Sequence, residues 1–364
     1  MSLAKKINKA LQKNGTLSGI MKENDISDIP YYVDTGSVVV NLITSGKFNG
    51  GVPAGMLTMF AGEKSSGKTF IATNVMKSIQ RDYEGTPVLV DSEFASTSES
   101  LESFGINTEE MLYLPLSDIK NEDKERSISY QLNVIDKEID KEDKVIIVLD
   151  SLGMTTTQRT QGNIEANNTS KDMSVVAERK ALLQQMLQIS AYKKVPTIVI
   201  NHSYEAIGSF TGGKVVSGGG ALYYPSNVIL IQSKAKWRDE NTKEQIGNIF
   251  TAVVYKGRLS RENSKVKFAI SYENGLSRYY NLEQYALEGE YIEESKDGRS
   301  TVYKIKDTDL VVRKKNLHAT IDDDYNKFWE YLFTNTSFGE YCDEIFAYGS
   351  KKKLKSLVIE DEEK

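Results

Sequence analysis

A glycine-rich segment, Gly62–Thr69, has the residues needed to bind a nucleoside triphosphate. It matches the phosphate-loop pattern G-x4-G-K-[ST] in full. Glycines let backbone N–H groups close around phosphate oxygens, and the following helix N-terminus adds positive potential. In this pattern Lys68 binds the β- and γ-phosphates, and the Thr69 hydroxyl is a Mg²⁺ ligand. The sequence therefore predicts binding of ATP and Mg²⁺, with nucleotide contacts from Gly62, Glu63, Lys64, Ser65, Ser66, Gly67, Lys68, Thr69 and Phe70.

Two acidic residues follow apolar segments that we expect to be strands. Lys144–Asp150 (KVIIVLD) ends in Asp150, which we expect to hold the magnesium ion or its waters, and Glu93 comes just after Pro87–Asp91 (PVLVD). Ligands of open parallel sheets gather at the carboxyl ends of the strands, so Glu93 should face the same crevice as Lys68 and orient water against the γ-phosphate. Taken alone, each acidic residue also fits an ordinary role in a turn.

Residues from about 31 to 280 alternate strands and helices. Continuous apolar strands separated by helices predict a mostly parallel sheet with helices on both faces, that is, an α/β fold. The runs IFTAVVY and VKFAISY after about residue 248 have no helix between them, so we expect antiparallel additions at one sheet edge. We expect strands at Met56–Phe60, Pro87–Asp91, Lys144–Asp150, Thr197–Asn201 and Val228–Ile231, and helices at Lys68–Tyr83, Ile128–Ile139 and Asp172–Ala191.

The chain is predicted to divide into four parts. Residues 1–30 form a short arm whose helical stripe, Ala4, Ile7 and Leu11, is broken at Asn14-Gly15. An arm of this size cannot hold a core alone, so it must pack on the main body or on another subunit, and we interpret it as a contact between protomers. Residues 31–283 form the ATPase core, residues 284–350 a small α+β C-terminal domain, and residues 351–364 a charged tail.

Composition and charge exclude several classes of protein. The 46 basic and 51 acidic residues give a net charge of −5, so any nucleic-acid site must be local. Because the chain has a single cysteine, Cys342, it cannot form an internal disulfide. Its two histidines, His202 and His318, lie far apart in the sequence, so a zinc site or a Ser-His-Asp hydrolase is a poor hypothesis. No apolar run approaches the roughly 18 residues of a membrane span, and the N-terminus has no signal core, so we expect a cytoplasmic protein.

Several segments resemble the RecA family of recombinases. The resemblance covers roughly residues 30–280 well and the C-terminal region more loosely. The segments NHSYE and FWEYLF (Phe328–Phe333) are more similar to the recombinases of T4-like phages than to bacterial RecA. The matching segments are Thr35–Thr69, Asp91–Phe94, Val145–Gly153, Thr197–Glu205 and Ser217–Ile231.

The resemblance implies a RecA-like core and a role for each site residue. Lys68 and Thr69 bind phosphate and magnesium, Asp150 supports the metal, and Glu93 positions the attacking water. His202 occupies the place of the family's γ-phosphate sensor. The family's adenine-stacking aromatic falls near Ser100, so this sequence lacks it.

Two polar, glycine-rich segments, at roughly residues 154–171 and 203–220, each follow an apolar strand. Loops this long inside a compact domain are usually functional, although mobile surface loops without a ligand are the alternative. The resemblance implies that they line a DNA channel, where inserted side chains tolerate any base sequence. The residues expected to contact DNA are Arg159, Lys171, Arg179, Tyr204, Phe210, Lys214, Gly218, Gly219 and Gly220.

The densest basic run in the body of the chain is Tyr255–Lys267. Such runs are usually solvated hairpins. The family places two cations here that cross the subunit boundary to the neighbour's ATP, and the resemblance assigns this role to Lys256 and Arg258.

These features favour an ATP-dependent homologous recombinase that forms helical filaments on single-stranded DNA and exchanges strands with a homologous duplex. Expected partners are single-stranded DNA, duplex DNA, further copies of the chain, a loading mediator and a single-strand-binding protein. A RecA-fold hexameric helicase or motor and a non-catalytic ATP-binding mediator are the alternatives. Lys68, Glu93 and Asp150 are all present, which argues against the mediator. The phage resemblance would place the protein in the host cytoplasm.

Overall fold

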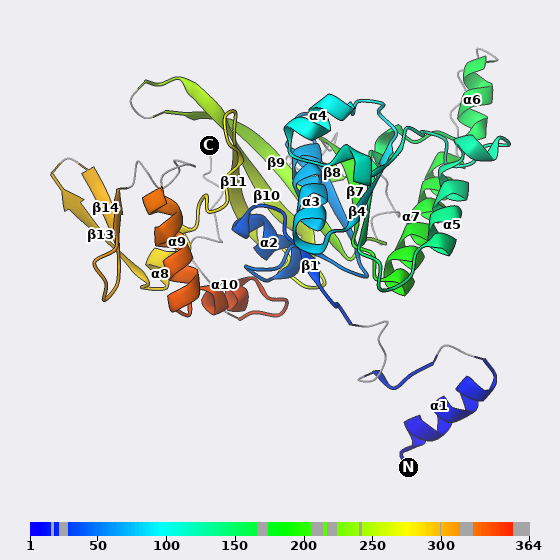
Figure 1. Cartoon of the computed structure of the whole chain (residues 1–364), viewed down its shortest axis with the longest axis horizontal. Helices are drawn as coiled ribbons and strands as arrows, with labels where there is room; N and C mark the ends of the chain where they lie inside the picture. The colour runs from blue at the N-terminus through cyan, green and yellow to red at the C-terminus, as the bar shows by residue number, and fades with distance from the viewer. Residues whose placement is uncertain are drawn as a thin grey trace.

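The computed structural model of this chain describes residues 1–15, 18–21, 28–165, 174–205, 214–216, 224–239, 242–298, 300–313 and 323–351. Figure 1 shows a central sheet with helices on both sides, a smaller group of strands and helices beside it, and a separate N-terminal helix. The C-terminal tail beyond Lys351 lies outside the described residues. None of the helices in the described ranges is long and apolar enough to cross a membrane.

The central sheet is parallel on one side and antiparallel on the other, as predicted. Its strands run parallel from β9 through β3, β7, β6 and β4 to β5, and antiparallel from β9 through β10 and β11 to β12, while β8 pairs with β7. In this order the strands are β12 (Gly275–Leu276), β11 (Lys265–Ser271), β10 (Gln245–Lys256), β9 (Asn227–Arg238), β3 (Leu57–Gly62), β7 (Thr197–Glu205), β6 (Val145–Asp150), β4 (Thr86–Asp91) and β5 (Leu112–Leu114), with β8 at Lys214–Val216.

Helices cover both faces of the parallel part of this sheet, which explains why β3, β4 and β6 are apolar and buried along almost their whole length. Alternate strand residues belong to two separate hydrophobic clusters: Phe60 and Val148 to one, Met59 and Leu149 to the other. The first cluster includes α2 (Val38–Ser45) and α3 (Lys68–Tyr83), and the second includes α5 (Ile128–Glu138) and α7 (Ser174–Lys193). A short helix, α4 (Ser98–Ser103), follows β4, and a two-stranded sheet joins β1 (Tyr32–Val33) to β2 (Val52–Pro53).

From residue 283 onward, the described part of the chain forms three antiparallel strands and three helices. Trp329, Phe338 and Phe346 belong to the same hydrophobic cluster as α2 and α3, so this region packs directly on the core. Its elements are α8 (Glu283–Glu288), β13 (Ile292–Asp297), β14 (Ser300–Ile305), β15 (Val311–Arg313), α9 (Asp323–Asn335) and α10 (Phe338–Phe346). The division of the chain into four parts stays a prediction.

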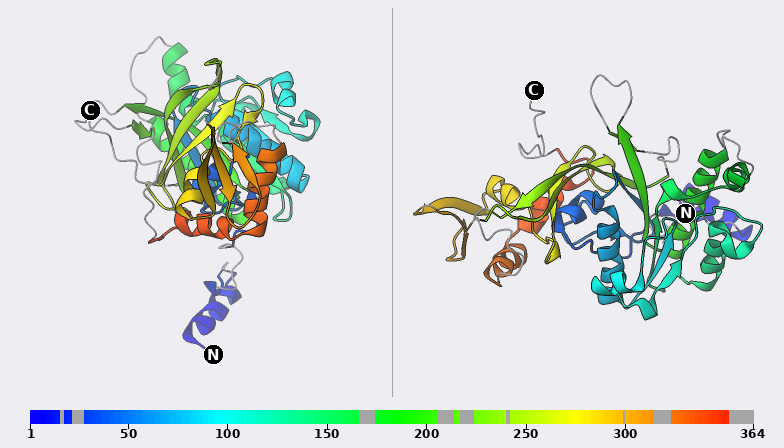
Figure 2. Two further views of the ribbon diagram at one scale, coloured as in Figure 1. Left: turned by 90° about the vertical axis from the view of Figure 1, so that its left-hand side faces the viewer. Right: turned by 90° about the horizontal axis from the view of Figure 1, so that it is seen from above.

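The N-terminal arm contains the helix α1 (Leu3–Lys13), which lies away from the main body in Figure 1 and in the left view of Figure 2. It ends at Lys13, before the capping residue Asn14 and Gly15 with φ +73°, as the sequence predicted. No residue of α1 is buried, and the exposed fractions of Leu3, Ile7 and Leu11 are 72%, 51% and 40%. Within one chain, therefore, the apolar stripe of α1 is uncovered.

The two segments predicted as loops contain regular structure. The first holds a short helix, α6 (Gln158–Glu165), so the prediction of a continuous loop there was wrong. The Thr157 hydroxyl accepts a hydrogen bond from the Thr160 backbone N–H at 3.1 Å, which satisfies a free donor at the helix start. The second segment includes the end of β7 and all of β8.

Candidate nucleotide site and nucleic-acid-binding loops

The phosphate loop connects the end of β3 to the first residue of α3. Gly67 precedes the helix with φ +85°, a conformation that side chains disfavour. A Cβ atom on Gly62 would lie 2.6 Å from the Ser66 Oγ and 3.1 Å from the Ile231 carbonyl oxygen, so glycine relieves crowding at that position. Both glycines therefore favour the observed path of the loop, which leaves its backbone open to phosphate at a helix N-terminus.

Lys68 lies inside this loop and is only 6% exposed. Its Nζ donates hydrogen bonds to the carbonyl oxygens of Gly62 at 3.1 Å and Glu63 at 2.7 Å, and to the Ser66 Oγ at 3.3 Å. Burial lowers the pKa of Lys68, while Asp150, Glu93 and Glu63 oppose that shift. The loop thus carries a nearly enclosed ammonium group, which fits a triphosphate.

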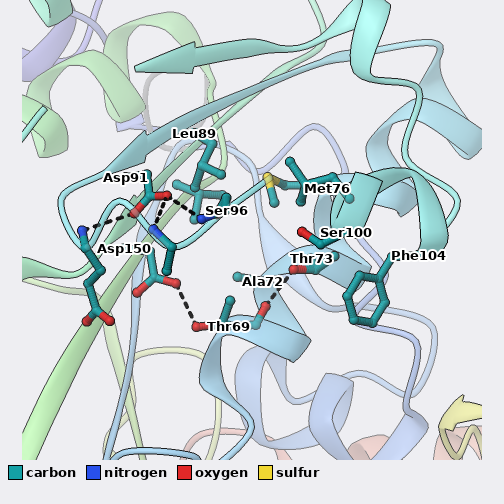
Figure 3. Close-up of a pocket in the computed structure, with 14 residues that line it drawn as sticks. Thr69, Ala72, Thr73, Met76, Leu89, Asp91, Ser96, Ser100, Phe104 and Asp150 are labelled. Atoms are coloured by element: carbon teal, nitrogen blue, oxygen red, sulfur yellow. Dashed lines mark hydrogen bonds between the residues drawn. The ribbon is translucent and has the colours of Figure 1, made fainter. Parts of the chain in front are cut away.

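Thr69 and Asp150 meet across the crevice, as Figure 3 shows. The Thr69 Oγ1 donates to the Asp150 Oδ2 at 2.7 Å. Burial raises the pKa of Asp150 to about 6, although its bond from Thr69 opposes the rise. No cluster of three or more His, Cys, Asp or Glu side chains suited to a metal occurs in the described ranges. The Thr69 hydroxyl and the Asp150 carboxylate suit Mg²⁺, which usually takes one or two protein ligands beside phosphates and water.

Glu93, Ser151 and His202 come together at the ends of β4 and β6 and on β7. The Glu93 Oε1 accepts a hydrogen bond from the Ser151 Oγ at 2.8 Å and lies 3.4 Å from the His202 Nε2. The Ser151 Oγ also lies 3.3 Å from the His202 Nε2. The structure thus brings two predicted catalytic residues together. Ser151 was not predicted; its place directly after Asp150 was the available signal.

An aromatic side chain borders the nucleotide crevice although Ser100 does not supply one. Phe104 lies one helical turn beyond Ser100 and packs edge-to-face on Phe70, with ring centroids 5.0 Å apart. Phe104 lines a cavity of about 350 Å³ beside the phosphate loop, together with Phe250. It also lines an adjoining cavity of about 130 Å³ that contains Ser100 (Figure 3). The four-residue spacing could have revealed Phe104, because residues one turn apart share a helix face.

The residues at which the two predicted DNA-binding loops begin lie next to each other, close to Glu93. The Arg179 Nη2 donates to the carbonyl oxygens of Gly153 at 2.7 Å and Thr155 at 2.8 Å, at the start of the first loop. A Cβ atom on Gly153 would lie 2.6 Å from the His202 Cδ2, so glycine makes room for the His202 ring at the start of the second loop. Burial lowers the pKa of Arg179.

The remaining predicted DNA contacts are placed only in part. Arg159 is exposed on α6, and Tyr204 is 54% exposed near the end of β7. The backbone of Lys214 pairs with Glu205 across β8 and β7. The predicted contacts that lie outside the described residues are Lys171, Phe210, Gly218, Gly219 and Gly220.

Lys256 and Arg258 lie beside the start of β9, toward the amino ends of the parallel strands, whereas the phosphate loop follows the carboxyl end of β3. Across the sheet, Lys256 of β10 is level with Val228 of β9 and Met59 of β3. Gly62, where the phosphate loop begins, is level with Ile231, three residues further along β9. The Lys256 Nζ donates to the Pro225 carbonyl oxygen at 2.7 Å, and Arg258 is exposed. Within one chain, the two cations are therefore not part of the nucleotide site.

Comparison with known proteins assigns the family. The family model described as the RecA N-terminal domain matches residues 2–277. The recombination and repair protein of Enterobacteria phage T4 is 26% identical over 338 residues, which span 92% of this chain and 82% of that protein. Protein RecA of Limosilactobacillus reuteri (strain DSM 20016) is 24% identical over 290 residues, spanning 78% of this chain and 75% of that one.

A crystal structure of the RadB recombinase matches 68% of this chain and 99% of its own, with 21% identity and a TM-score of 0.47. The family-model match spans most of the chain, including both the phosphate loop and the segments that follow β6 and β7. The sequence resemblance is therefore confirmed, and the chain belongs to the RecA family of recombinases, whose members are DNA-dependent ATPases.

Proposed function

We propose that this protein is an ATP-dependent homologous recombinase whose ATP-bound protomers polymerise on single-stranded DNA, pair it with a homologous duplex and exchange strands. The observation that carries the proposal is the position of the His202 ring. Its Nε2 lies 3.4 Å from the Glu93 Oε1, and the ring packs against Gly153, where a side chain would collide with it. His202 precedes the second loop and Gly153 precedes the first. A change in either loop on binding DNA would therefore reach the residues that face the γ-phosphate.

The chemical roles follow from the positions of the side chains. Lys68 supplies positive charge inside the loop, and Thr69 with Asp150 would hold Mg²⁺, which neutralises phosphate charge when bound. One carboxylate oxygen of Glu93 accepts a hydrogen bond from the Ser151 hydroxyl. The other makes no hydrogen bond to a described residue. That oxygen is the group that would take a proton from the attacking water. His202, beside it, would donate a hydrogen bond to the γ-phosphate.

Electron microscopy of the protein with single-stranded DNA and a non-hydrolysable ATP analogue tests this proposal. Helical filaments with a stoichiometry of a few nucleotides per protomer are expected. Closed rings that unwind duplex DNA would instead support a hexameric helicase. Homologous duplex DNA is the further partner that strand exchange requires, and a loading mediator and a single-strand-binding protein are proposed as accessory partners.

Phe104 is proposed to stack on the adenine base in place of the missing aromatic at Ser100. Phe104→Ala is expected to raise the KM for ATP about tenfold with little change in kcat, because stacking on one base contributes roughly 1–3 kcal/mol to binding. Tyr348→Ala, which removes a 68% exposed ring from the C-terminal region, is the control. Steady-state ATPase kinetics measure both variants, and an unchanged KM for Phe104→Ala would remove this residue from the base site.

Self-assembly has a candidate contact in the uncovered arm. A groove of about 520 Å³ between β5 and α5 is lined by apolar side chains that include Leu112, 41% exposed, and Val134, 38% exposed. Three acidic residues and one lysine also line it: Glu84, Glu138, Asp143 and Lys144. The α1 helix is complementary, since its exposed Leu3, Ile7 and Leu11 accompany Lys5, Lys6, Lys9 and Lys13. We assign this groove to the α1 helix of the neighbouring protomer.

Ile7→Asp is expected to shift assembly to at least tenfold higher protein concentration, because burying one isoleucine contributes roughly 1.5–3 kcal/mol. Val134→Asp should produce the same defect from the groove side. Asn8→Asp, which adds the same charge on α1 and can still accept the Ser18 hydroxyl, is the control. Light scattering or sedimentation of the DNA-free protein with ATP measures assembly. Equal behaviour of Ile7→Asp and Asn8→Asp would contradict this contact.

A further inference from the structure

A buried carboxylate, Asp91, holds the loop that carries Glu93. Asp91 is 1% exposed. Its carboxylate accepts hydrogen bonds from the backbone N–H groups of Glu93 at 3.0 Å, Ala95 at 3.1 Å and Ser96 at 2.9 Å. A buried charge is costly unless hydrogen bonds compensate it, so these donors and Asp91 hold one another in place. Figure 3 shows Asp91 and Ser96 joined on the wall of the nucleotide crevice. Asp91 thus fixes where the backbone of Glu93 lies.

The other donor to Asp91 comes from the outermost parallel strand. The Tyr113 hydroxyl donates to the Asp91 Oδ2 at 3.1 Å, and it lies 3.5 Å from the Ser96 carbonyl oxygen. Tyr113 sits on β5, where it is paired with Leu89 of β4. Burial raises the pKa of Tyr113, and Asp91 adds to the rise, so the hydroxyl keeps its proton and remains a donor.

The strand that carries Tyr113 has one free edge. β5 has three residues and pairs only with β4 among the described strands. Its neighbouring residue Leu112 lines the groove that we assign to α1 of the next protomer. A protomer docked there would therefore restrain β5 directly, and with it the Tyr113 hydroxyl.

We propose that Tyr113 is a positioning residue that couples an occupied β5 edge to Glu93 through Asp91. A docked neighbour fixes β5, the Tyr113 hydroxyl fixes the Asp91 carboxylate, and Asp91 fixes the backbone of Glu93 beside the γ-phosphate. The inference rests on the proposed function, since it requires both assembly and hydrolysis by Glu93. It adds a route by which assembly controls hydrolysis that is separate from Lys256 and Arg258.

Tyr113→Phe removes only the hydroxyl and tests this coupling. The kcat for DNA-stimulated ATP hydrolysis is expected to fall about tenfold, with KM unchanged within about twofold, because one hydrogen bond to a charged group is lost and no nucleotide contact is removed. The ratio of wild-type to variant kcat should increase with protein concentration as protomers assemble. A ratio that is the same at every concentration would contradict the link to the β5 edge. Tyr130→Phe, on an exposed tyrosine of α5, is the matched control.

A double-mutant comparison separates positioning of Glu93 from a general loss of stability. In a Glu93→Gln background, Tyr113→Phe should leave the residual rate unchanged, because the residue that it positions no longer acts as a base. A further tenfold loss in that background would overturn the proposal. If the wild-type protein itself hydrolyses no ATP with single-stranded DNA, the proposed function fails. If it does, and Tyr113→Phe keeps the wild-type kcat, only this inference fails.

Discussion

Glu93→Gln is expected to reduce ATP turnover by about 10²- to 10⁴-fold while ATP binding survives. Glutamine has nearly the same shape and can still accept the Ser151 hydroxyl, which lies 2.8 Å from the Glu93 Oε1, but it cannot take a proton from water. Lys68, Thr69 and Asp150 are untouched, so the phosphates and the metal should still bind. Complexes of this variant with ATP and DNA should therefore be long-lived.

The measurements are ATP affinity by equilibrium binding and turnover by steady-state phosphate release. Glu99→Gln, which makes the same chemical change on an exposed residue of α4, is the control and should retain wild-type turnover. Wild-type turnover by Glu93→Gln would show that Glu93 is not the catalytic base. Loss of ATP binding would show instead that the carboxylate serves binding.

A mixture of two inactive variants is expected to recover ATP turnover. Lys256 and Arg258 lie toward the amino ends of the parallel strands and the phosphate loop lies at the carboxyl end of β3, so within one chain the two cations are not part of the candidate nucleotide site. We propose that they complete the site of the next protomer, where such a cation accelerates phosphoryl transfer by roughly 10³–10⁵. Lys256→Ala with Arg258→Ala keeps an intact phosphate loop, whereas Lys68→Ala keeps both cations. Each alone should be inactive.

In mixed filaments, a Lys68→Ala protomer supplies cations to the intact phosphate loop of the double variant. Turnover should be maximal near equal proportions, where such contacts are most frequent. Co-assembly on DNA must be measured in the same samples, for example by energy transfer between labelled protomers. Co-assembly without any recovery of turnover would exclude the trans role. Full activity of the double variant alone would also exclude it.

The central sheet and the geometry of the phosphate loop were predictable because local pattern and tertiary structure agree there. Strands buried on both faces are apolar throughout, and α3 spans Lys68–Tyr83 as its sequence pattern indicated. β9 was predicted only to Ile231, because the next five residues are mostly polar and exposed and give no core signal before the buried Trp237. The helix α6 was missed for the same reason, since it has no apolar stripe of its own.

Pairings between distant segments were the part that sequence patterns did not reveal. Arg179 was predicted to contact DNA, but in the structure its guanidinium donates to the Gly153 and Thr155 carbonyl oxygens. Its role toward DNA stays a prediction. The Tyr113 contact with Asp91 joins residues 22 positions apart, and no spacing rule for helices or strands relates them. Such contacts depend on strand order, which only the folded chain defines.

Strand exchange between circular single-stranded DNA and a homologous linear duplex tests the central claim most directly. The purified protein is expected to convert these substrates to joint molecules and nicked circles only with ATP and Mg²⁺, and only when the sequences are homologous. Lys68→Ala should give no product. Robust DNA-stimulated ATP hydrolysis without joint molecules, on homologous substrates and with filaments present, would contradict the assignment as a recombinase.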